Sequence, residues 1–308
     1  MTPDVVVVGA ATRDVDAEAP GGWRAGGAVS YGALLLARLG LRVAALVGLD
    51  EISIDAGEPA ELRAAGVEVV TAPLARGPVF ENVETPAGRT QTCHQISDPL
   101  PASGLPAGWR AAAAFLLVPV AREIGPEWAP VPGPDALVGL GWQGLLRDLA
   151  AGRPVRHLAP RRGPIQARAD ITVLSREDLP PRGTGTRREG VDAGDAIPDL
   201  LGRAGSGLAL TAGSDGGVYL RRAADGRLAA RRWRPVQPRR EVDPTGAGDV
   251  FLAALLAARL LLGPGRGDGG RALRFAATAA SLSVEAWGLA GVPDLAAIQR
   301  RLREIRTA

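Results

Sequence analysis

The sequence predicts an α/β protein built around a mostly parallel β-sheet. The main observation is an alternation of strands and helices in the first 70 residues. Strands are indicated at 5–10, 41–50 and 67–70, with helices between them at 26–40 and 56–66. This alternation is typical of parallel strands joined by crossover helices. The strand at 5–10, VVVVGA, is apolar throughout, as expected of a strand covered on both faces.

The same pattern continues along the chain, with a strand at 111–121, a strand ending in a polar corner at 170–179, and two strands around a Gly-rich turn at 207–220. Helices are indicated at 271–288 and 293–305. The stretch 136–149 is expected to be a strand followed by a helix.

Residues 71–100 differ from this layered pattern. They alternate polar and apolar residues and carry turn residues at 86–88, which predicts antiparallel strands in an insertion or flap. Residues 180–195 are expected to form a loop. The basic run 231–240 has one aromatic residue, so it is interpreted as a solvated strand or loop and not as a nucleic-acid site.

Composition narrows the function classes. The 308 residues are 46% hydrophobic, enough for one large domain or two smaller ones. The 36 basic residues are all Arg, and the net charge is +3. A single cysteine, Cys93, excludes an internal disulfide and fits a reducing compartment. No apolar run reaches the roughly 18 residues of a membrane span. We therefore expect a cytoplasmic protein with no membrane or nucleic-acid partner.

Several chemistries lack the residues they require. Without Lys there is neither a Walker phosphate loop nor a Schiff-base nucleophile. No GxSxG elbow occurs, and no GxGxxG follows the first strand. The two histidines, His94 and His157, and Cys93 have no zinc-site spacing.

The stretch DPTGAGDVF at 243–251 carries the clearest chemical signal. Gly246 and Gly248 precede an apolar helix that is expected to begin near Ala247. The unpaired N–H groups and positive dipole end of such a helix suit a phosphate. Asp249 would then lie in the first turn, where a carboxylate could take a proton from an attacking hydroxyl. Physical reasoning leaves an alternative open, in which Asp243 or Thr245 caps the helix and Asp249 favours its dipole.

Several motifs, in the same order along the chain, resemble the ribokinase-like (PfkB) carbohydrate kinases. VDPTGAGDVFLAAL (242–255) is similar to the family's C-terminal motif D-T-x-G-A-G-D, with Pro244 in place of Thr. The other matching stretches are VVVVGAATRDVD (5–16), GGAVSYGALLLARLG (26–40), LRVAALVGLDE (41–51), ALVGLGWQGLLR (136–147), DITVLSREDL (170–179), LALTAGSDGGVYL (208–220) and AATAASLSVEAWGLAGVP (276–293).

The resemblance implies a ribokinase-like three-layer sandwich: one domain over 1–308, with a central mostly parallel sheet and a small β lid from about 12–26 and 78–98. It implies ATP-dependent phosphorylation of a hydroxyl on a small polyhydroxylated substrate, either a sugar, a nucleoside or a cyclitol, with Mg²⁺ and K⁺ as cofactors.

The resemblance also implies roles for individual residues. Asp249 is the catalytic base, beside an anion hole of Gly246, Ala247 and Gly248. The remaining assignments are the substrate residues Asp14, Gly26, Gly27, Tyr31 and Arg89, the nucleotide residues Thr211, Gly213, Gly216 and Thr245, and the metal ligands Asp178 for Mg²⁺ and Asp243 for a monovalent cation.

Two positions depart from the family pattern. The family's N-x-x-E magnesium motif is replaced by Ser175-Arg176-Glu177-Asp178, and Tyr31 stands where many relatives have Asn. Tyr31 could stack on a substrate ring or fill space. The altered motif motivates an alternative, a non-catalytic relative that senses a ligand or nucleotide. An acid-pair glycosidase is a third hypothesis, based only on plentiful carboxylates. The lid could also pair with a second lid in a homodimer through its exposed strands.

Overall fold

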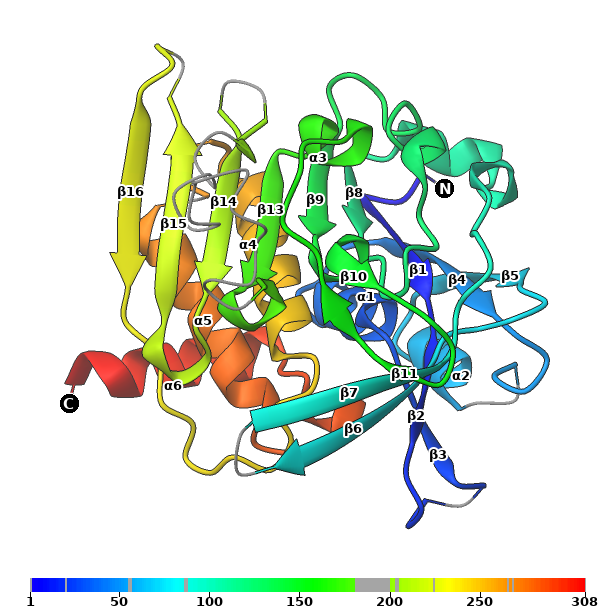
Figure 1. Ribbon diagram of the computed structural model, residues 1–308. Coiled ribbons are helices and arrows are strands. Elements are labelled where there is room, and N and C mark those ends of the chain that lie inside the picture. The colour runs from blue at the N-terminus through cyan, green and yellow to red at the C-terminus, as the bar shows by residue number, and fades with distance from the viewer. Residues whose placement is uncertain are drawn as a thin grey trace, which may run out of the picture.

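A large, mostly parallel sheet forms the centre of the molecule. The computed structural model describes residues 2–19, 21–54, 57–85, 88–180, 200–202, 205–223, 225–264, 266–267 and 269–307. Within these residues nine strands form the central sheet (Figure 1). In spatial order they are β16 (Leu228–Trp233), β15 (Gly217–Arg222), β14 (Gly207–Thr211), β13 (Ile171–Ser175), β9 (Leu137–Gly141), β8 (Ala114–Leu117), β1 (Val5–Ala10), β4 (Val43–Leu49) and β5 (Glu68–Pro73).

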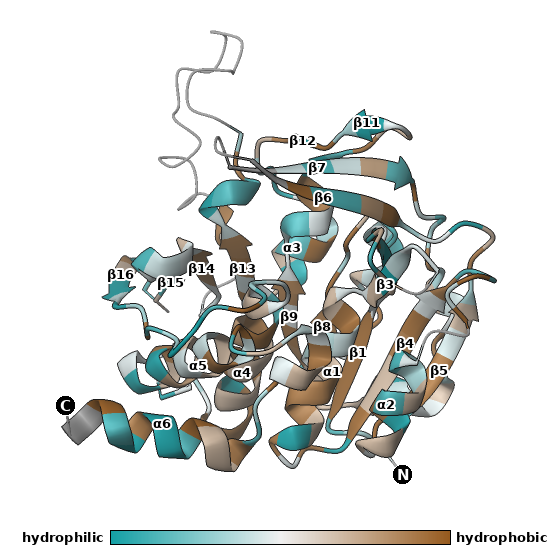
Figure 2. Cartoon of the chain, turned by 90° about the horizontal axis from the view of Figure 1, so that it is seen from below, coloured by the Kyte–Doolittle hydropathy of each residue, from teal (hydrophilic) through white to brown (hydrophobic). Residues whose placement is uncertain are grey.

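The strands from β14 to β5 are all parallel, and β15 and β16 extend the sheet antiparallel at one edge. Strands β1, β4 and β8 are buried at every position, and Figure 2 shows them as mostly hydrophobic. The α/β class predicted from the strand–helix alternation is therefore confirmed.

Three helices pack side by side along one face of this sheet: α1 (Ala28–Arg38), α4 (Ala247–Leu262) and α5 (Gly270–Ser283). The other helices are α2 (Glu58–Ala64) beside β5, α3 (Pro164–Arg168) beside β9, and α6 (Leu295–Thr307) beside α5. None of the helices in the described part of the chain is both long and apolar enough to span a bilayer.

A second sheet crosses the carboxyl ends of the parallel strands, where Figure 1 shows β6 and β7. Among the described residues it has five strands in the order β11 (Arg153–Pro154), β7 (Gly88–Gln95), β6 (Val79–Thr85), β2 (Thr12–Val15) and β3 (Trp23–Gly26). We call it the lid sheet. The antiparallel pair expected within 71–100 is β6 with β7. Strand β11 was not expected from the sequence. The loop expected at 180–195 falls almost entirely outside the described residues.

The helix expected in the second half of 136–149 is absent from the structure, so this prediction was wrong. After β9 the chain makes a short 3-10 turn at Gln143–Leu146 and then strand β10 (Arg147–Asp148), which pairs with β12 (Arg156–His157). The backbone at Gly144 passes so close to Pro119 that a Cβ would lie 2.0 Å from the Pro119 carbonyl oxygen. This close approach leaves no room for a helical side chain and directs Arg147 inward.

A buried ion pair joins the lid sheet to the central sheet. Nη2 of Arg13, in β2, lies 2.7 Å from Oδ2 of Asp50, directly after β4. The same carboxylate accepts hydrogen bonds from the backbone N–H and hydroxyl of Ser53 and from the N–H of Gly77. Burial alone would raise the pKa of Asp50, but hydrogen bonds from Ser53 and Arg13 hold that pKa below its usual value. The carboxylate is therefore ionised and pairs with Arg13 at neutral pH.

Replacing Arg13 by Met should lower the free energy of unfolding by about 3 kcal/mol, because it leaves the Asp50 carboxylate buried without its cation. The matched control is Arg42→Met. Arg42 pairs with Asp4 but is 58% exposed, so its loss should cost less than about 1 kcal/mol. Urea denaturation at pH 7 measures both changes. Equal effects of the two substitutions would show that the Arg13–Asp50 pair does not anchor the lid sheet.

Candidate active site

The amino end of α4 is a glycine turn at the carboxyl edge of the central sheet. Gly246 is the residue before the helix and has φ +79°, a conformation that only glycine adopts readily. Among the described residues no side chain caps α4, so the expectation that Asp243 or Thr245 caps this helix is wrong. Asp249 does lie in the first turn, where its charge also favours the helix dipole. The first N–H groups of the helix and its positive dipole end face this edge, as an anion site requires.

Asp243 holds this turn in place. Its Oδ1 accepts a hydrogen bond from the N–H of Thr245 at 2.9 Å, and its Oδ2 accepts one from the N–H of Gly288 at 3.0 Å. Gly288 begins a 3-10 turn, Gly288–Gly291, that follows α5. One buried carboxylate thus ties the start of α4 to the segment after α5.

Asp249 lies in the first turn of α4, with part of its surface still accessible. Burial of the carboxyl group raises the pKa of Asp249 to about 7. The guanidinium of Arg147 acts in the opposite direction, and the negative charge of Asp178 adds to the rise. A carboxylate with this pKa is a far better proton acceptor at neutral pH than an exposed Asp.

The predicted substrate residues Asp14, Gly26 and Gly27 come together where the lid sheet meets α1. A Cβ on Gly26 would lie 2.7 Å from Oδ2 of Asp14, so a glycine at this position makes room for the carboxylate. Gly27 has φ +124° and precedes the first residue of α1. Asp14 therefore lies beside the amino end of a second helix.

Tyr31 connects this substrate side to the glycine turn of α4. Its side chain is 4% exposed, and a Cβ on Gly246 would lie 2.3 Å from its ring. Burial raises the pKa of Tyr31, and the carboxyl groups of Asp243, Asp249, Glu58 and Asp14 raise it further. Of the two roles left open for Tyr31, this packing favours filling space beneath the site.

Asp178 and Ser175 form a capping box at the end of β13. Oδ2 of Asp178 accepts a hydrogen bond from the N–H of Ser175 at 2.9 Å, and Oδ1 accepts one from the side-chain amide of Gln143 at 2.9 Å. Each oxygen keeps a further lone pair. Among the described residues no three His, Cys, Asp or Glu side chains cluster as metal ligands. A single carboxylate still suits Mg²⁺, which commonly binds through one or two carboxylates, water and substrate phosphates.

Three of the predicted nucleotide residues lie at the end of the neighbouring strand or in the turn after it, whereas Thr245 lies in the turn before α4. Thr211 ends β14 and pairs with Ser175 across the parallel ladder. Gly213 and Gly216, in the turn that follows, have φ +51° and +83°. A Cβ on Gly216 would lie 2.4 Å from the Trp233 carbonyl oxygen, so both conformation and space favour glycine there. Arg89 belongs to β7, but its side chain lies outside the described residues.

Three residues of this region were not found from the sequence. Arg147 lies among the carboxyl groups of Asp178, Asp14, Glu123 and Asp249. The first-turn carboxyl of α2, Glu58, has a pKa raised to about 8 by burial and by Asp14, so it is largely protonated at neutral pH. Glu123 accepts hydrogen bonds from the N–H groups of Ala10, Val120 and Ala121. The sequence offered a signal for only one of these three residues: Arg147 is the last residue of the stretch 136–147, which resembles the kinase family.

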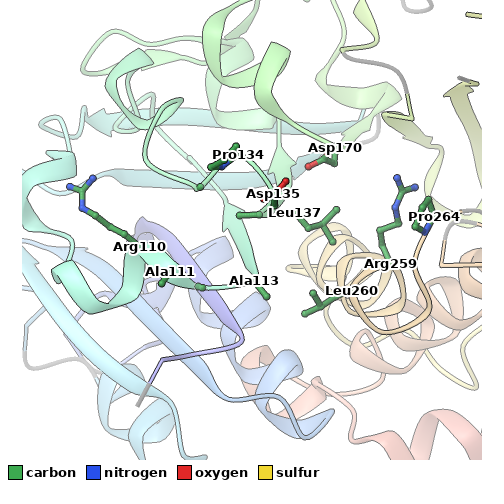
Figure 3. Close-up of a pocket in the computed structure, with 13 residues that line it drawn as sticks. Arg110, Ala111, Ala113, Pro134, Asp135, Leu137, Asp170, Arg259, Leu260 and Pro264 are labelled. Carbon is green, nitrogen blue, oxygen red and sulfur yellow. The ribbon is translucent and has the colours of Figure 1, made fainter.

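A cavity of about 590 Å³ lies elsewhere, at the amino ends of β8, β9 and β13 (Figure 3). Arg110, Asp135, Asp170 and Arg259 are among its lining residues. Its lining contains none of the predicted site residues, and parallel α/β sheets bind ligands at the opposite, carboxyl edge. We therefore place the candidate active site at the carboxyl edge, where the charges of Asp249, Asp178 and Arg147 act on one another.

The comparisons with known proteins support a carbohydrate kinase. Part of the chain matches a model of the PfkB family of carbohydrate kinases. The model of this family, "pfkB family carbohydrate kinase", matches residues 188–294, which include the glycine turn and Asp249. The resemblance drawn from the sequence motifs is therefore confirmed. No curated protein matches the chain.

Solved structures support the ribokinase-like fold over nearly the whole chain. A pyrophosphate-dependent kinase in the ribokinase family, complexed with a pyrophosphate analog and myo-inositol, is 20% identical with a TM-score of 0.69, over 97% of this chain and 99% of that one. Arabidopsis thaliana ribokinase, complexed with ribose and ATP, is 21% identical with a TM-score of 0.66, over 98% and 99%. Giardia lamblia ribokinase is 17% identical with a TM-score of 0.69, over 99% and 100%.

Replacing Gly246 by Ala should lower the free energy of unfolding by about 2–4 kcal/mol. The new side chain would need a left-handed backbone and would overlap the Tyr31 ring. Gly248→Ala is the matched control, because nothing lies within 4 Å of a Cβ there and the position is helical. It should leave stability unchanged or raise it slightly. Thermal and urea unfolding compare the two, and equal stability would contradict the described packing of Tyr31 on Gly246.

Proposed function

We propose that the protein transfers the γ-phosphoryl group of ATP to a hydroxyl of a small polyhydroxylated molecule, such as a sugar, nucleoside or cyclitol. The observation that carries the proposal is the position of Asp249. Its carboxyl group lies in the first turn of a helix that no described side chain caps, and its charge, like that of Asp14, acts on the buried phenol of Tyr31.

The proposed step is an in-line displacement. Asp249 takes the proton of the acceptor hydroxyl, and the acceptor oxygen forms a bond to the γ-phosphorus. The bond from that phosphorus to the bridging oxygen breaks, and ADP leaves with the electron pair. The N–H groups of Gly246, Ala247 and Gly248 stabilise the negative charge on the phosphoryl oxygens, as donors fixed in advance do in other phosphoryl transfers.

The acceptor side offers several hydrogen-bonding groups. The Asp14 carboxylate would accept hydrogen bonds from acceptor hydroxyls, and the protonated Glu58 carboxyl would donate one. Gly26 and Gly27 would let the acceptor approach the backbone closely. Closing the lid sheet over the acceptor would exclude water, which would otherwise compete for the phosphoryl group. We assign Arg89 to this side from its family position alone.

The donor side would be formed by Thr211, Gly213, Gly216 and Thr245, with Asp178 as a ligand of Mg²⁺ and Asp243 beside a monovalent cation. Mg²⁺ would neutralise charge on the donor phosphates. Asp178 is held for this role by Ser175 and Gln143. Because one structural relative is described as pyrophosphate-dependent, the donor test includes pyrophosphate beside ATP.

Asp249→Asn should reduce turnover by at least about 10³-fold, because the amide cannot accept the hydroxyl proton. Folding and donor binding should remain close to wild type. The assay combines ATP or pyrophosphate with a panel of ribose, myo-inositol, other sugars and nucleosides, and follows release of ADP or phosphate. Asp225→Asn, a change at an exposed Asp paired with Arg227, is the control and should keep wild-type turnover.

Near-normal turnover in Asp249→Asn would exclude Asp249 as the base. If the wild-type protein turned over no acceptor but was thermally stabilised by one of them, the non-catalytic sensor would replace the kinase as its function.

The pH dependence follows from the raised pKa of Asp249. The base must be ionised, so activity should be lost as pH falls through about 7 and should be full above about 8. The kcat/KM for the donor should therefore fall about tenfold for each pH unit below 6. A profile that is flat from pH 5.5 to 8 would contradict this, since an exposed Asp would already be ionised throughout that range.

A further inference from the structure

The side chain of Arg147 is buried in the middle of the candidate site. It comes from β10, the short strand that replaces the expected helix, and the residue is 7% exposed. Its Nη1 donates a hydrogen bond to the Val120 carbonyl oxygen at 2.8 Å. Its Nε is buried and has no hydrogen-bond partner among the described residues. A guanidinium has five N–H donors, so most of its donating capacity is not used by the protein described here.

Four carboxyl groups from separate elements act electrostatically on this guanidinium. They belong to Asp178 at the end of β13, Asp14 in β2, Glu123 after β8 and Asp249 in α4. Burial lowers the pKa of Arg147, and these four groups oppose the change, so the side chain stays charged. Among the described residues Arg147 itself makes no ion pair, although each of these carboxyl groups acts on it electrostatically.

Another buried arginine of the same chain shows what a structural role looks like. Nη2 of Arg301 donates to both carboxylate oxygens of Glu285, at 2.8 and 3.0 Å. Arg301 is also 7% exposed, but its charge is neutralised by contact. A buried guanidinium with unsatisfied N–H groups is costly, and an anionic ligand that accepted hydrogen bonds from them would reduce that cost.

We propose that Arg147 is a catalytic residue that contacts the phosphoryl group during its transfer from donor to acceptor. This inference rests on the proposed kinase function. It adds the guanidinium of Arg147 to the groups that stabilise the transferred phosphoryl group. The planar guanidinium suits bidentate binding of phosphate oxygens, and it would hold the group between the donor side at Asp178 and the base Asp249. Arg147 forms no covalent bond. It neutralises charge on the phosphoryl oxygens while the bonds change.

The lid sheet positions this arginine. The guanidinium stacks on the ring of Phe80, in β6, with its central carbon 5.1 Å from the ring centre. Phe80 is 1% exposed and lies directly opposite Asp14 in the pairing of β2 with β6. The acceptor-side carboxylate and the ring that supports Arg147 are thus neighbours in one sheet. A movement of the lid sheet on acceptor binding would move the guanidinium with it.

The kinetic test removes the positive charge of Arg147 and keeps an unbranched side chain of similar size at this position. Arg147→Met should reduce kcat by about 10²–10³-fold, the cost of removing one preorganised charge donor. Arg147→Lys keeps the positive charge but lacks the planar guanidinium. Its kcat should therefore lie between the values of the wild type and Arg147→Met. The control is Arg259→Met, a change at an arginine that is 8% exposed and lies near the carboxyl end of α4. It should keep kcat within about threefold. Circular dichroism confirms that each variant is folded.

Binding of inorganic phosphate and pyrophosphate, measured by calorimetry without acceptor, separates this inference from the kinase proposal. We expect both ions to bind the wild type and Arg259→Met, to bind Arg147→Lys more weakly, and to lose at least tenfold in affinity for Arg147→Met. This pattern would support an anion contact even if no acceptor were turned over. Unchanged anion affinity in folded Arg147→Met, or a kcat within threefold of wild type, would overturn the proposal.

The pH profile gives an independent measurement. Arg147 lowers the pKa of Asp249, whereas burial and Asp178 raise it. Arg147→Met should therefore move the acid limb of kcat/KM to higher pH, and Arg147→Lys should leave it near the wild-type position. An unshifted limb in Arg147→Met would show that the guanidinium does not act at the reacting centre.

Discussion

The burial of helix α4 is the constraint on which the rest of the structure depends. Every residue from Val250 to Arg259 is buried, between α1, α5 and strands β8, β9 and β13. A helix covered in this way cannot end in apolar surroundings, because its first N–H groups need partners. Its amino end therefore lies at the carboxyl edge of the sheet, beneath the lid sheet. The same requirement that orders the core places the amino end of α4, which no described side chain caps, at the edge where we propose that phosphate binds.

A second constraint is the balance of charge around that helix end. Asp14, Asp178, Glu123 and Asp249 converge on one buried guanidinium. Burial of carboxyl groups, together with the negative charge of a neighbouring Asp, raises the pKa values of Asp249 and Glu58. Such an arrangement is poor for stability, whereas it favours proton transfer near neutral pH. Carboxyl groups with raised pKa values occur together at one edge of the sheet, which is itself an argument for a functional site at that edge.

The sequence was informative wherever one segment specified its own structure. The apolar run at 5–10, the glycine-opened helix at 26–40 and the GAGD turn before an apolar helix all predicted their elements, because periodicity and glycine placement are local signals. Arg147 was missed because its role depends on contacts with residues distant in the chain. The approach of Gly144 to Pro119 turns an expected helix into a short strand, and no local pattern reports it. Strand β11 was missed for the same reason, because its partner Cys93 lies 60 residues earlier.

Tyr31 shows how a departure from the family pattern can be accommodated. Its ring occupies the space that a side chain at position 246 would need, so Tyr31 and Gly246 constrain each other. Its phenol lies near Asp243, which fixes the turn, and near Asp14, on the acceptor side. A smaller residue at 31 would leave a cavity beneath the turn and remove a rigid contact between α1 and α4. The proposed substrate side and the glycine turn of α4 are therefore joined by one buried aromatic ring. A substitution of Tyr31 would thus alter the geometry of the glycine turn as well as that of the proposed acceptor side.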